Sequence, residues 1–255
     1  MWFQWLDNMK KVFNQKFYKN LYLDMFIPER DEFYTIIHFH GGGLVEGDKG
    51  DTHNYCEALC EKGFAVATAN YTLIPEAHFP EFLYEAANAI KFVKERISKY
   101  GRNKGFIISG SSAGGWITLM LCFNKEYLES VGIKNEDIYA WVSESGQTTT
   151  HFNILERERR LNPWIQRIDE AAPLFYVDDK VEFSRMLLVT YENDLPSRSE
   201  QNDLLVSTIK FFKRRLDIRH EILDGKHCEG SSVLNEDGEY EMANLIKGWI
   251  FNYDW

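Results

Sequence analysis

The sequence predicts an α/β fold in which a mostly parallel central sheet is covered by helices on both faces. Extended apolar runs alternate with helical patterns along the chain, which is typical of such a layered fold. Several runs are short and apolar throughout, as expected for strands that are buried on both faces. With 255 residues, of which 44% are hydrophobic, the chain suits one large core, and we expect residues 1–255 to form a single domain.

The individual elements follow from these patterns. The expected strands lie at residues 21–27, 33–39, 64–70, 104–109, 138–143, 186–191 and 218–223. The clearest helix is predicted for residues 80–99, where Pro80 stands in the first turn and Gly101 follows the end. Further helices are expected at residues 199–215 and 240–251, and an apolar helix begins near Trp116.

Two segments outside this alternation are candidates for a small cap. Residues 1–20 carry apolar side chains at helical spacing, and we expect an N-terminal helix that packs on the domain. A helix lying on a membrane surface is the alternative, because this segment is locally basic. Residues 147–169 are polar, threonine-rich and then strongly charged, which indicates an insertion on the rim of the sheet.

Composition and charge exclude several classes of partner. The formal net charge of -10 argues against nucleic acid, which requires clustered lysine and arginine. No segment approaches the roughly eighteen apolar residues of a membrane span, so a membrane partner is not expected. The first residues lack the features of a secretory signal, and the cysteines form no Cys-x-x-Cys pair. We therefore expect a cytoplasmic protein with reduced thiols at Cys56, Cys60, Cys122 and Cys228.

The pattern Gly-Ser-Ser-Ala-Gly at residues 110–114 stands between a predicted strand and a predicted helix. A sharp turn in this context needs small neighbours and lifts Ser112 off the sheet. The start of the following helix directs free N–H groups and a positive dipole end at the same place. An ordinary glycine-rich turn is the alternative, whereas a dinucleotide-binding loop would need G-x-G-x-x-G spacing. We predict that Ser112 is a nucleophile.

Two later strands end in residues that suit a general base and an orienting acid. Parallel strands bring their carboxyl ends to one edge of a sheet, so the residues after those strands can meet Ser112. His227 follows the last predicted strand, and we expect it within hydrogen-bond reach of Ser112. Asp194 follows the strand before it and is preferred as the acid over Glu192. The order Ser, Asp, His is that of α/β-hydrolases, not that of chymotrypsin or subtilisin.

The stretch His-Phe-His-Gly-Gly-Gly at residues 38–43 permits two interpretations. His38 and His40 lie on one face of a predicted strand, as in a metal-binding His-x-His pair. A metal site also needs ligands after other strands, and no matching set is found, so neither a metal nor another cofactor is expected. The three glycines instead let the backbone approach a ligand with no Cβ in the way.

Together these motifs resemble α/β-hydrolases of the esterase/lipase group related to hormone-sensitive lipase. The similarity runs from about residue 33 to the C-terminus. Residues 70–76, Asn-Tyr-Thr-Leu-Ile-Pro-Glu, resemble the Tyr-Arg-Leu-x-Pro-Glu segment of that group, with Thr72 where the group usually has arginine. Ser111 stands where many members have aspartate. The resemblance implies the α/β-hydrolase fold with a small cap.

The resemblance also implies a division of labour among the three side chains. Ser112 would attack an acyl carbonyl while His227 accepts its proton. Asp194 would hold the imidazole tautomer and stabilise the charged imidazole. These roles agree with the residue chemistry, because a serine hydroxyl is a poor nucleophile without a base.

Backbone groups of the glycine loop complete the site that the resemblance implies. The developing oxyanion would be received by the N–H groups of Gly42, Gly43 and Ala113. His40 and Gly41 would support the loop, with His40 in a structural role. His38 is then interpreted as a core neighbour.

Three functions agree with these residues. A serine carboxylesterase acting on a small-molecule ester with a short acyl group comes first, because 255 residues leave little room for a large lid. An arylformamidase-like amide hydrolase is the second, since residues 194–201 are reminiscent of that group, although Gly43-Leu44 departs from its Gly-Gly-aromatic loop. A non-catalytic binding protein is the third. The oligomeric state is open, a homodimer included, and the acyl pocket depends on how these side chains fold over the site: Trp2, Trp5, Leu44, Trp141, Phe152 and Trp164.

Overall fold

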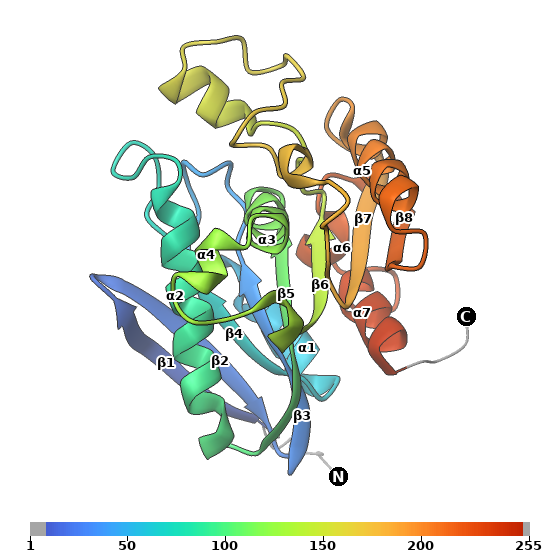
Figure 1. Ribbon diagram of the computed structural model, residues 1–255. Coiled ribbons are helices and arrows are strands. Elements are labelled where there is room, and N and C mark those ends of the chain that lie inside the picture. The colour runs from blue at the N-terminus through green and yellow to red at the C-terminus, as the bar shows by residue number, and fades with distance from the viewer. Residues whose placement is uncertain (1–8, 252–255) are drawn as a thin grey trace.

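The computed structural model describes residues 9–251, which surround one eight-stranded sheet with the order β1-β2-β4-β3-β5-β6-β7-β8 (Figure 1). The strands are β1 (Met9–Tyr18), β2 (Leu21–Pro28), β3 (Glu32–Phe39), β4 (Ala65–Ala69), β5 (Arg102–Ser111), β6 (Ile138–Glu144), β7 (Arg185–Asn193) and β8 (Asp217–Lys226). The pairs β1·β2 and β2·β4 are antiparallel, and the pairs from β4 to β8 are parallel. The seven strands predicted from the sequence correspond to β2–β8.

The predicted N-terminal helix is wrong over the residues that the structure describes. Residues 9–18 form β1, which pairs along the outer edge of β2. Met9, Phe13 and Phe17 are four residues apart, and that spacing agrees with the two-residue period of a strand as well as with a helix. Backbone pairing with the edge of β2 decides in favour of the strand. Trp2 and Trp5 lie outside the described residues.

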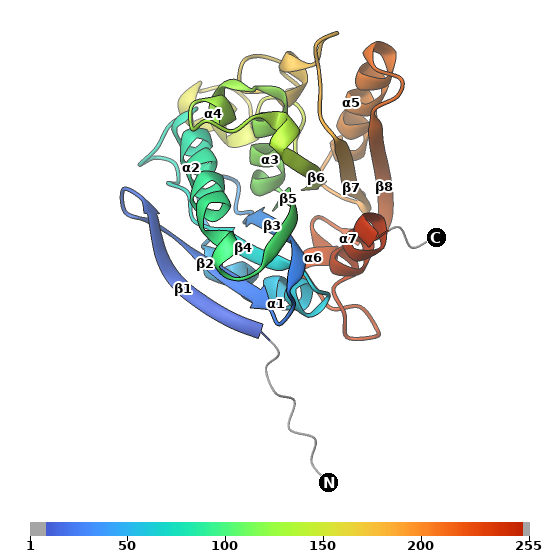
Figure 2. The same ribbon diagram turned by 60° about the horizontal axis from the view of Figure 1, so that its bottom comes forward.

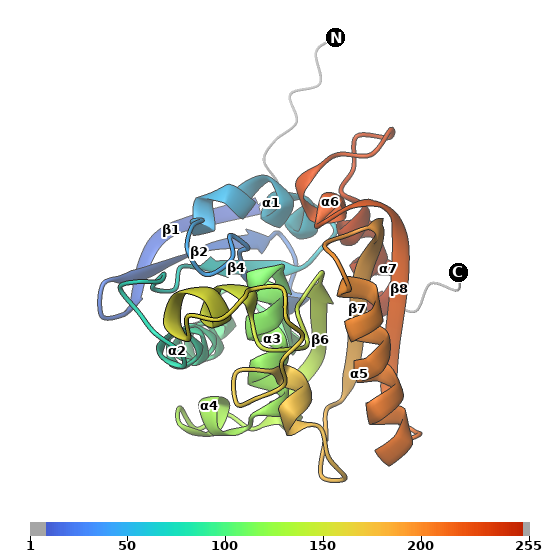
Figure 3. The same ribbon diagram turned by 90° about the horizontal axis from the view of Figure 1, so that it is seen from above.

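Helices cover both faces of the sheet (Figures 2 and 3). The longer helices are α1 (His53–Glu61), α2 (Glu81–Arg96), α3 (Ala113–Phe123), α5 (Arg198–Phe212) and α7 (Glu241–Phe251), and the shorter ones are α4 (Glu126–Glu129) and α6 (Glu229–Ser232). One core cluster joins the sheet to α2, α3 and α5, and the other joins it to α1 and α7. Continuous burial of β4 follows from this double cover.

Three predicted helices are present with shifted ends. The helix predicted at residues 80–99 is α2, which ends at Arg96 and continues as a single 3-10 turn, Ile97–Lys99. The helix predicted at 199–215 is α5, which ends at Phe212 before the charged residues 213–215. The helix predicted at 240–251 is α7. Other 3-10 turns are Lys49–Thr52, Asn135–Asp137 and Pro173–Tyr176.

The predicted insertion at residues 147–169 lies beyond the carboxyl ends of the central strands, where Figure 1 shows it in yellow-green above α3. It contains a short π-helix, Ile154–Glu158. The hydroxyl of Thr148 donates to the carbonyl of Gln201 in α5 (3.0 Å), and the carboxylate of Glu158 accepts the N–H of Phe79 (3.0 Å). The insertion is therefore bonded to α5 at one end and to the segment before α2 at the other.

The helices of residues 9–251 are too short or too polar to cross a lipid bilayer. The four cysteines are free thiols. Burial raises the pKa of Cys56 and of Cys60 to about 12, so both are protonated at neutral pH. These two residues therefore act as small apolar side chains on the inner face of α1.

Candidate active site

Ser112 stands in a strained turn between β5 and α3. Its φ of 55° and ψ of -112° lie outside the helical and extended regions. The turn requires glycine on the helix side, because a Cβ at Gly114 would lie 1.9 Å from the carbonyl oxygen of Phe39. A Cβ at Gly110 would lie 2.2 Å from the backbone of Gly114. The turn therefore has the geometry that the sequence pattern predicted.

Ser112, His227 and Asp194 form a chain of hydrogen bonds. The Nε2 atom of His227 lies 2.8 Å from the Oγ atom of Ser112, and the Nδ1 atom lies 2.5 Å from Oδ1 of Asp194. A carboxylate only accepts, so Nδ1 carries the proton and Nε2 accepts the Ser112 hydroxyl. The predicted hydrogen bond between Ser112 and His227 is confirmed, and the residues come from the ends of three different strands.

The carboxylate of Asp194 is held in its ionised form. Burial opposes ionisation, but hydrogen bonds from His227 and from the hydroxyl of Ser145 (2.6 Å) outweigh it, so the pKa of Asp194 is lowered. The N–H of Leu195 donates a further bond of 2.7 Å. Glu192, the alternative acid, is exposed at the end of β7, and within residues 9–251 it has no hydrogen bond to His227.

The glycine loop approaches Ser112 from the end of β3. Gly42 and Gly43 have φ values of 102° and 62°. A Cβ at Gly42 would lie 2.0 Å from the carbonyl oxygen of Glu46, and a Cβ at Gly41 would lie 3.4 Å from the Cβ of Ser112. Only glycine fits the position of Gly42. At Gly41, the missing side chain lets the loop lie directly against the turn of Ser112.

His40 and Tyr71 stabilise this loop through ring stacking and hydrogen bonds to its carbonyl groups. The rings of His40 and Tyr71 stack with centroids 4.4 Å apart. The Nδ1–H of His40 donates to the carbonyl of Gly41 (2.7 Å), and the hydroxyl of Tyr71 donates to the carbonyl of His40 (3.0 Å). Burial lowers the pKa of His40 and keeps the ring neutral. Thr72, in the segment after β4, donates from its N–H and its hydroxyl to Glu85 (2.7 and 2.9 Å).

A pocket of ≈ 660 Å³ opens beside Ser112 and is lined by the glycine loop, His227, Phe152 and Asn153. In the described chain the N–H groups of Gly42, Gly43 and Ala113 have no hydrogen-bond acceptor. Gly42 and Gly43 line the pocket, and Ala113 is the first residue of α3, next to Ser112. Unpaired N–H groups at such positions are suited to a negatively charged oxygen. The pocket thus brings a hydroxyl, an imidazole and free N–H donors together.

Four of the side chains considered for the acyl pocket lie within residues 9–251: Leu44, Trp141, Phe152 and Trp164. Phe152 lines the pocket, and the ring of Trp164 stacks on it with centroids 6.3 Å apart. Leu44 and Trp141 are fully buried in the core and do not line the pocket. Spacing along the chain contains no information on this difference, because it depends on which way each segment folds.

His38 is buried beside Ser109 and Tyr55. Its Nδ1 atom lies 3.2 Å from the hydroxyl of Ser109, and burial lowers the pKa of His38 to about 3. Within the described residues no three His, Cys, Asp or Glu side chains gather as metal ligands do. His38 contacts Tyr55 edge to face and is a core neighbour of the glycine loop.

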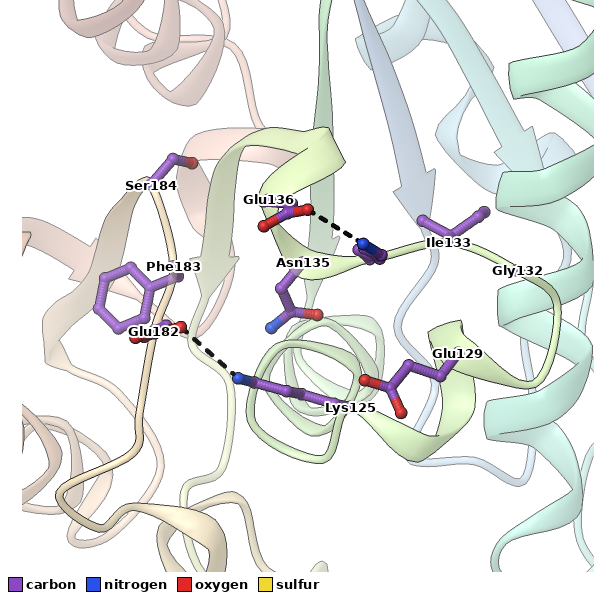
Figure 4. Close-up of a pocket in the computed structure, with 10 residues that line it drawn as sticks. Lys125, Glu129, Gly132, Ile133, Asn135, Glu136, Glu182, Phe183 and Ser184 are labelled. Atoms are coloured by element: carbon purple, nitrogen blue, oxygen red, sulfur yellow. Dashed lines mark ion pairs between the residues drawn. The ribbon is translucent and has the colours of Figure 1, made fainter.

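A second pocket of ≈ 600 Å³ lies at the opposite edge of the sheet, before the first residues of β6 and β7 (Figure 4). Its walls carry charged side chains, including the ion pairs Lys125–Glu182 (3.8 Å) and Lys134–Glu136 (3.5 Å). Its lining contains no histidine, cysteine or backbone turn like that of Ser112. The pocket at the carboxyl ends of the strands, which contains Ser112 and His227, is therefore the candidate active site.

Sequence reasoning missed four residues that contact this site. Glu144 is the last residue of β6 and Ser145 follows it, while Tyr191 is the last buried residue of β7. The rule that polar residues after parallel strands meet at one edge could have indicated Ser145. Asn153 lies inside the insertion, and only the folded position of that segment reveals its contact with the carbonyl of Gly43 (2.6 Å).

A family model named BD-FAE matches residues 23–155, slightly more than half of the chain. The chain belongs to the BD-FAE family. The matched part of this BD-FAE family member contains the glycine loop and the turn of Ser112, and it ends before Asp194 and His227.

Curated relatives of this BD-FAE family member are esterases and lipases. The chain is 31% identical over 89 residues to lipase 2 of Moraxella sp. (strain TA144), which covers 34% of this chain and 21% of the relative. It is 35% identical over 97 residues to the esterase LipI of Mycobacterium tuberculosis, which covers 37% of this chain and 30% of the relative. The matches thus span less than a third of either relative.

Solved structures establish the fold of this BD-FAE family member. Esterase B from Lactobacillus rhamnosis (HN001) superposes with a TM-score of 0.77 at 16% identity, covering 96% of this chain and 85% of that chain. A hyperthermophilic esterase from Pyrobaculum calidifontis superposes with a TM-score of 0.73 at 20% identity, covering 96% and 85%. The fold is that of the α/β-hydrolases, as the resemblance predicts.

Proposed function

We propose that the chain is a serine carboxylesterase that hydrolyses short-acyl esters through an acyl-enzyme intermediate. The observation that carries this proposal is the chain of hydrogen bonds from Ser112 through His227 to Asp194, at 2.8 and 2.5 Å. Hydroxyl, imidazole and carboxylate in this order are the parts that nucleophilic acyl transfer needs. The esterase and lipase names of the relatives support the same class of reaction.

In the first half of the reaction, Ser112 Oγ attacks the carbonyl carbon of the ester while His227 Nε2 accepts the hydroxyl proton. The bond to the leaving alcohol then breaks, and His227 returns that proton to the alcohol oxygen. In the second half, a water oxygen attacks the acyl carbon while His227 Nε2 accepts a proton from the water. The bond between the acyl carbon and Ser112 Oγ then breaks, His227 returns the proton to Oγ, and the carboxylic acid leaves. Asp194 keeps Nδ1 protonated and stabilises the imidazolium that forms in both halves.

The carbonyl oxygen becomes an oxyanion in both halves of the reaction. The N–H groups of Gly42, Gly43 and Ala113 have no acceptor within residues 9–251, and we assign them to this oxygen. Donors that are already oriented stabilise the developing charge without rearrangement. The stacked pair of His40 and Tyr71 supports the loop that carries two of these donors.

A short acyl group agrees with the position of Phe152. Its Cζ atom lies 3.5 Å from the position that a Cβ on Gly43 would occupy, so the ring lies next to the glycine loop in the wall of the pocket. We assign this ring to the part of the wall that limits the length of an acyl chain on the carbonyl carbon. We therefore expect acetate and butyrate esters to react faster than long-chain esters.

The test is hydrolysis of p-nitrophenyl acetate and butyrate by the full chain after treatment with a chelator. Ser112→Ala is expected to remove activity, and activity equal to that of the wild type would refute a serine mechanism. Asp194→Asn is expected to lower kcat by about 10³- to 10⁴-fold, because the imidazole takes the wrong tautomer. Glu192→Gln is the matched control and should retain activity.

A formamide substrate separates this function from an amide hydrolase. N-formylkynurenine should be turned over more slowly than the p-nitrophenyl esters. Faster turnover of this compound, with loss in the Ser112→Ala variant, would assign the same site to formamide hydrolysis instead. Binding of esters without turnover in the wild type would point to a non-catalytic protein.

A further inference from the structure

The carboxylate of Glu144 is buried behind the turn of Ser112, and the reaction steps above do not use it. Glu144 is 1% exposed at the end of β6. Its Oε2 atom accepts the hydroxyl of Ser111 (2.6 Å), and its Oε1 atom accepts the hydroxyl of Tyr191 (2.5 Å) and the N–H of Ser231 (3.1 Å). Within residues 9–251 no lysine or arginine forms an ion pair with it. A buried carboxylate of this kind depends on its hydrogen bonds.

The directions of these hydrogen bonds agree with an ionised carboxylate. The hydroxyl of Tyr191 accepts the N–H of Gly230 (2.9 Å), so its own proton is free for Glu144. The hydroxyl of Ser111 lies 3.1 Å from that of Ser231 and can accept from it while donating to Glu144. Burial raises the pKa of Glu144, and the hydrogen bonds from Ser111, Ser231 and Tyr191 limit the rise. Glu144 is the common acceptor of the cluster.

The contacts of Glu144 reach two of the loops that carry the candidate catalytic residues. Ser111 directly precedes Ser112, whose N–H also donates to the backbone carbonyl of Glu144 (2.8 Å). Ser231 lies in α6, which begins two residues after His227. A single side chain is therefore bonded to the segment before the nucleophile and to the segment after the base.

We propose that Glu144 is a positioning residue that holds the loops of Ser112 and His227 at reacting distance. It supplies, from the neighbouring strand, a carboxylate that accepts the hydroxyl of Ser111. The parallel register pairs Ser111 with Glu144 across β5 and β6, so both side chains leave the sheet on the same side. This inference rests on the proposed function of Ser112 and His227.

Glu144→Gln tests the proposal with almost no change in volume. The amide places an NH2 group against hydroxyl or N–H donors, so one of the contacts to Ser111, Tyr191 or Ser231 is lost. We expect kcat for p-nitrophenyl acetate to fall by about 10- to 100-fold, because small displacements of reacting groups have effects of this size. KM should change by less than about threefold, since Glu144 does not line the pocket.

Asp24→Asn is the matched control for the loss of a buried carboxylate. Asp24 is 1% exposed in β2, which three strands separate from β6, and it bonds to Lys49 (2.8 Å) and His53 (2.9 Å). This variant should lower the melting temperature at least as much as Glu144→Gln and keep kcat within about threefold, since breaking a buried ion pair destabilises a fold. An equal loss of kcat in both variants would reduce Glu144 to a structural role and overturn the proposal.

Restoring a carboxylate in the turn of Ser112 provides a second readout. In the Glu144→Gln background, Ser111→Asp should recover kcat at least about fivefold, because the charge returns to the same cluster. An unchanged kcat in Glu144→Gln, with correct folding, would overturn the proposal. Labelling of Ser112 by a fluorophosphonate distinguishes failure of the proposed function from failure of the Glu144 proposal. An unlabelled wild type contradicts the proposed function. Labelling of Glu144→Gln at the wild-type rate contradicts only the role of Glu144.

Discussion

The side-chain amide of Asn153 donates a hydrogen bond of 2.6 Å to the carbonyl oxygen of Gly43. This bond joins the insertion to the glycine loop. The Oδ1 atom of Asn153 accepts from the guanidinium of Arg157 one turn later (3.3 Å), which orients the amide. The conformation of the loop that would bind the oxyanion therefore depends on a segment more than one hundred residues away in the sequence.

We expect Asn153→Ala to lower kcat/KM for p-nitrophenyl acetate by about tenfold, because Gly43 loses its tether and its N–H is no longer held in one direction. Asn88→Ala is the control, since the amide of Asn88 makes a similar bond to the carbonyl of Tyr84 (2.8 Å) in α2, away from the pocket. The two variants should have similar melting temperatures. Equal activities in the two variants would show that the tether has no effect on the reaction.

Gly42→Ala should remove nearly all activity. A Cβ at this position would lie 2.0 Å from the carbonyl oxygen of Glu46, so the backbone must move, and the φ of 102° adds strain. Gly238→Ala is the matched control, because Gly238 has a φ of 75° and no heavy atom near its added Cβ. Steady-state kinetics and thermal unfolding of both variants check this. If Gly42→Ala were as active as Gly238→Ala, the loop would not bind the oxyanion.

Phe152→Ala should shift the acyl preference toward longer chains. Removing the ring opens the pocket beside Gly43, and each additional buried methylene contributes about 0.8 kcal/mol. The ratio of kcat/KM for the octanoate to that for the acetate should rise by about tenfold or more. Phe175→Ala removes a ring that is 55% exposed and does not line the pocket, and its ratio should equal that of the wild type.

Acidification should weaken the fold before the carboxylates titrate. Burial lowers the pKa of His38 from 6.5 to about 3, so the folded state keeps this ring neutral while the unfolded chain binds a proton. Stability from this group is complete above pH 6.5 and is lost as the pH falls toward about 3, with a slope of about 1.4 kcal/mol per pH unit.

Urea unfolding between pH 7 and pH 4 measures this slope in the wild type and in His38→Gln. The free energy of unfolding should depend less on pH in the variant, whatever its stability at pH 7. His78→Gln, at a side chain that is 66% exposed, is the control for removing a histidine. Equal slopes in the wild type and His38→Gln would mean that His38 is not held neutral.

Local patterns were sufficient for most of the sheet and for the chemistry at its edge. The turn of Ser112 depends on five consecutive residues. The positions of Asp194 and His227 beside it follow from the rule that the carboxyl ends of parallel strands meet at one edge of the sheet. The strands β2–β8 follow from apolar runs that are too short for helices. Spacing failed for residues 9–18, because a four-residue repeat is compatible with both periods and only pairing with β2 separates them.

The sequence by itself determined the fold class, the order of strands β2–β8 along the chain and the three side chains that meet beside the pocket. Each of these depends on a few neighbouring residues or on strand direction. The tertiary structure alone decided that Glu144 accepts the hydroxyl of Ser111, that Asn153 bonds to Gly43 and that Phe152 lines the pocket. Those contacts join residues from different elements, and their partners are chosen by packing in three dimensions, which periodicity along the chain does not encode.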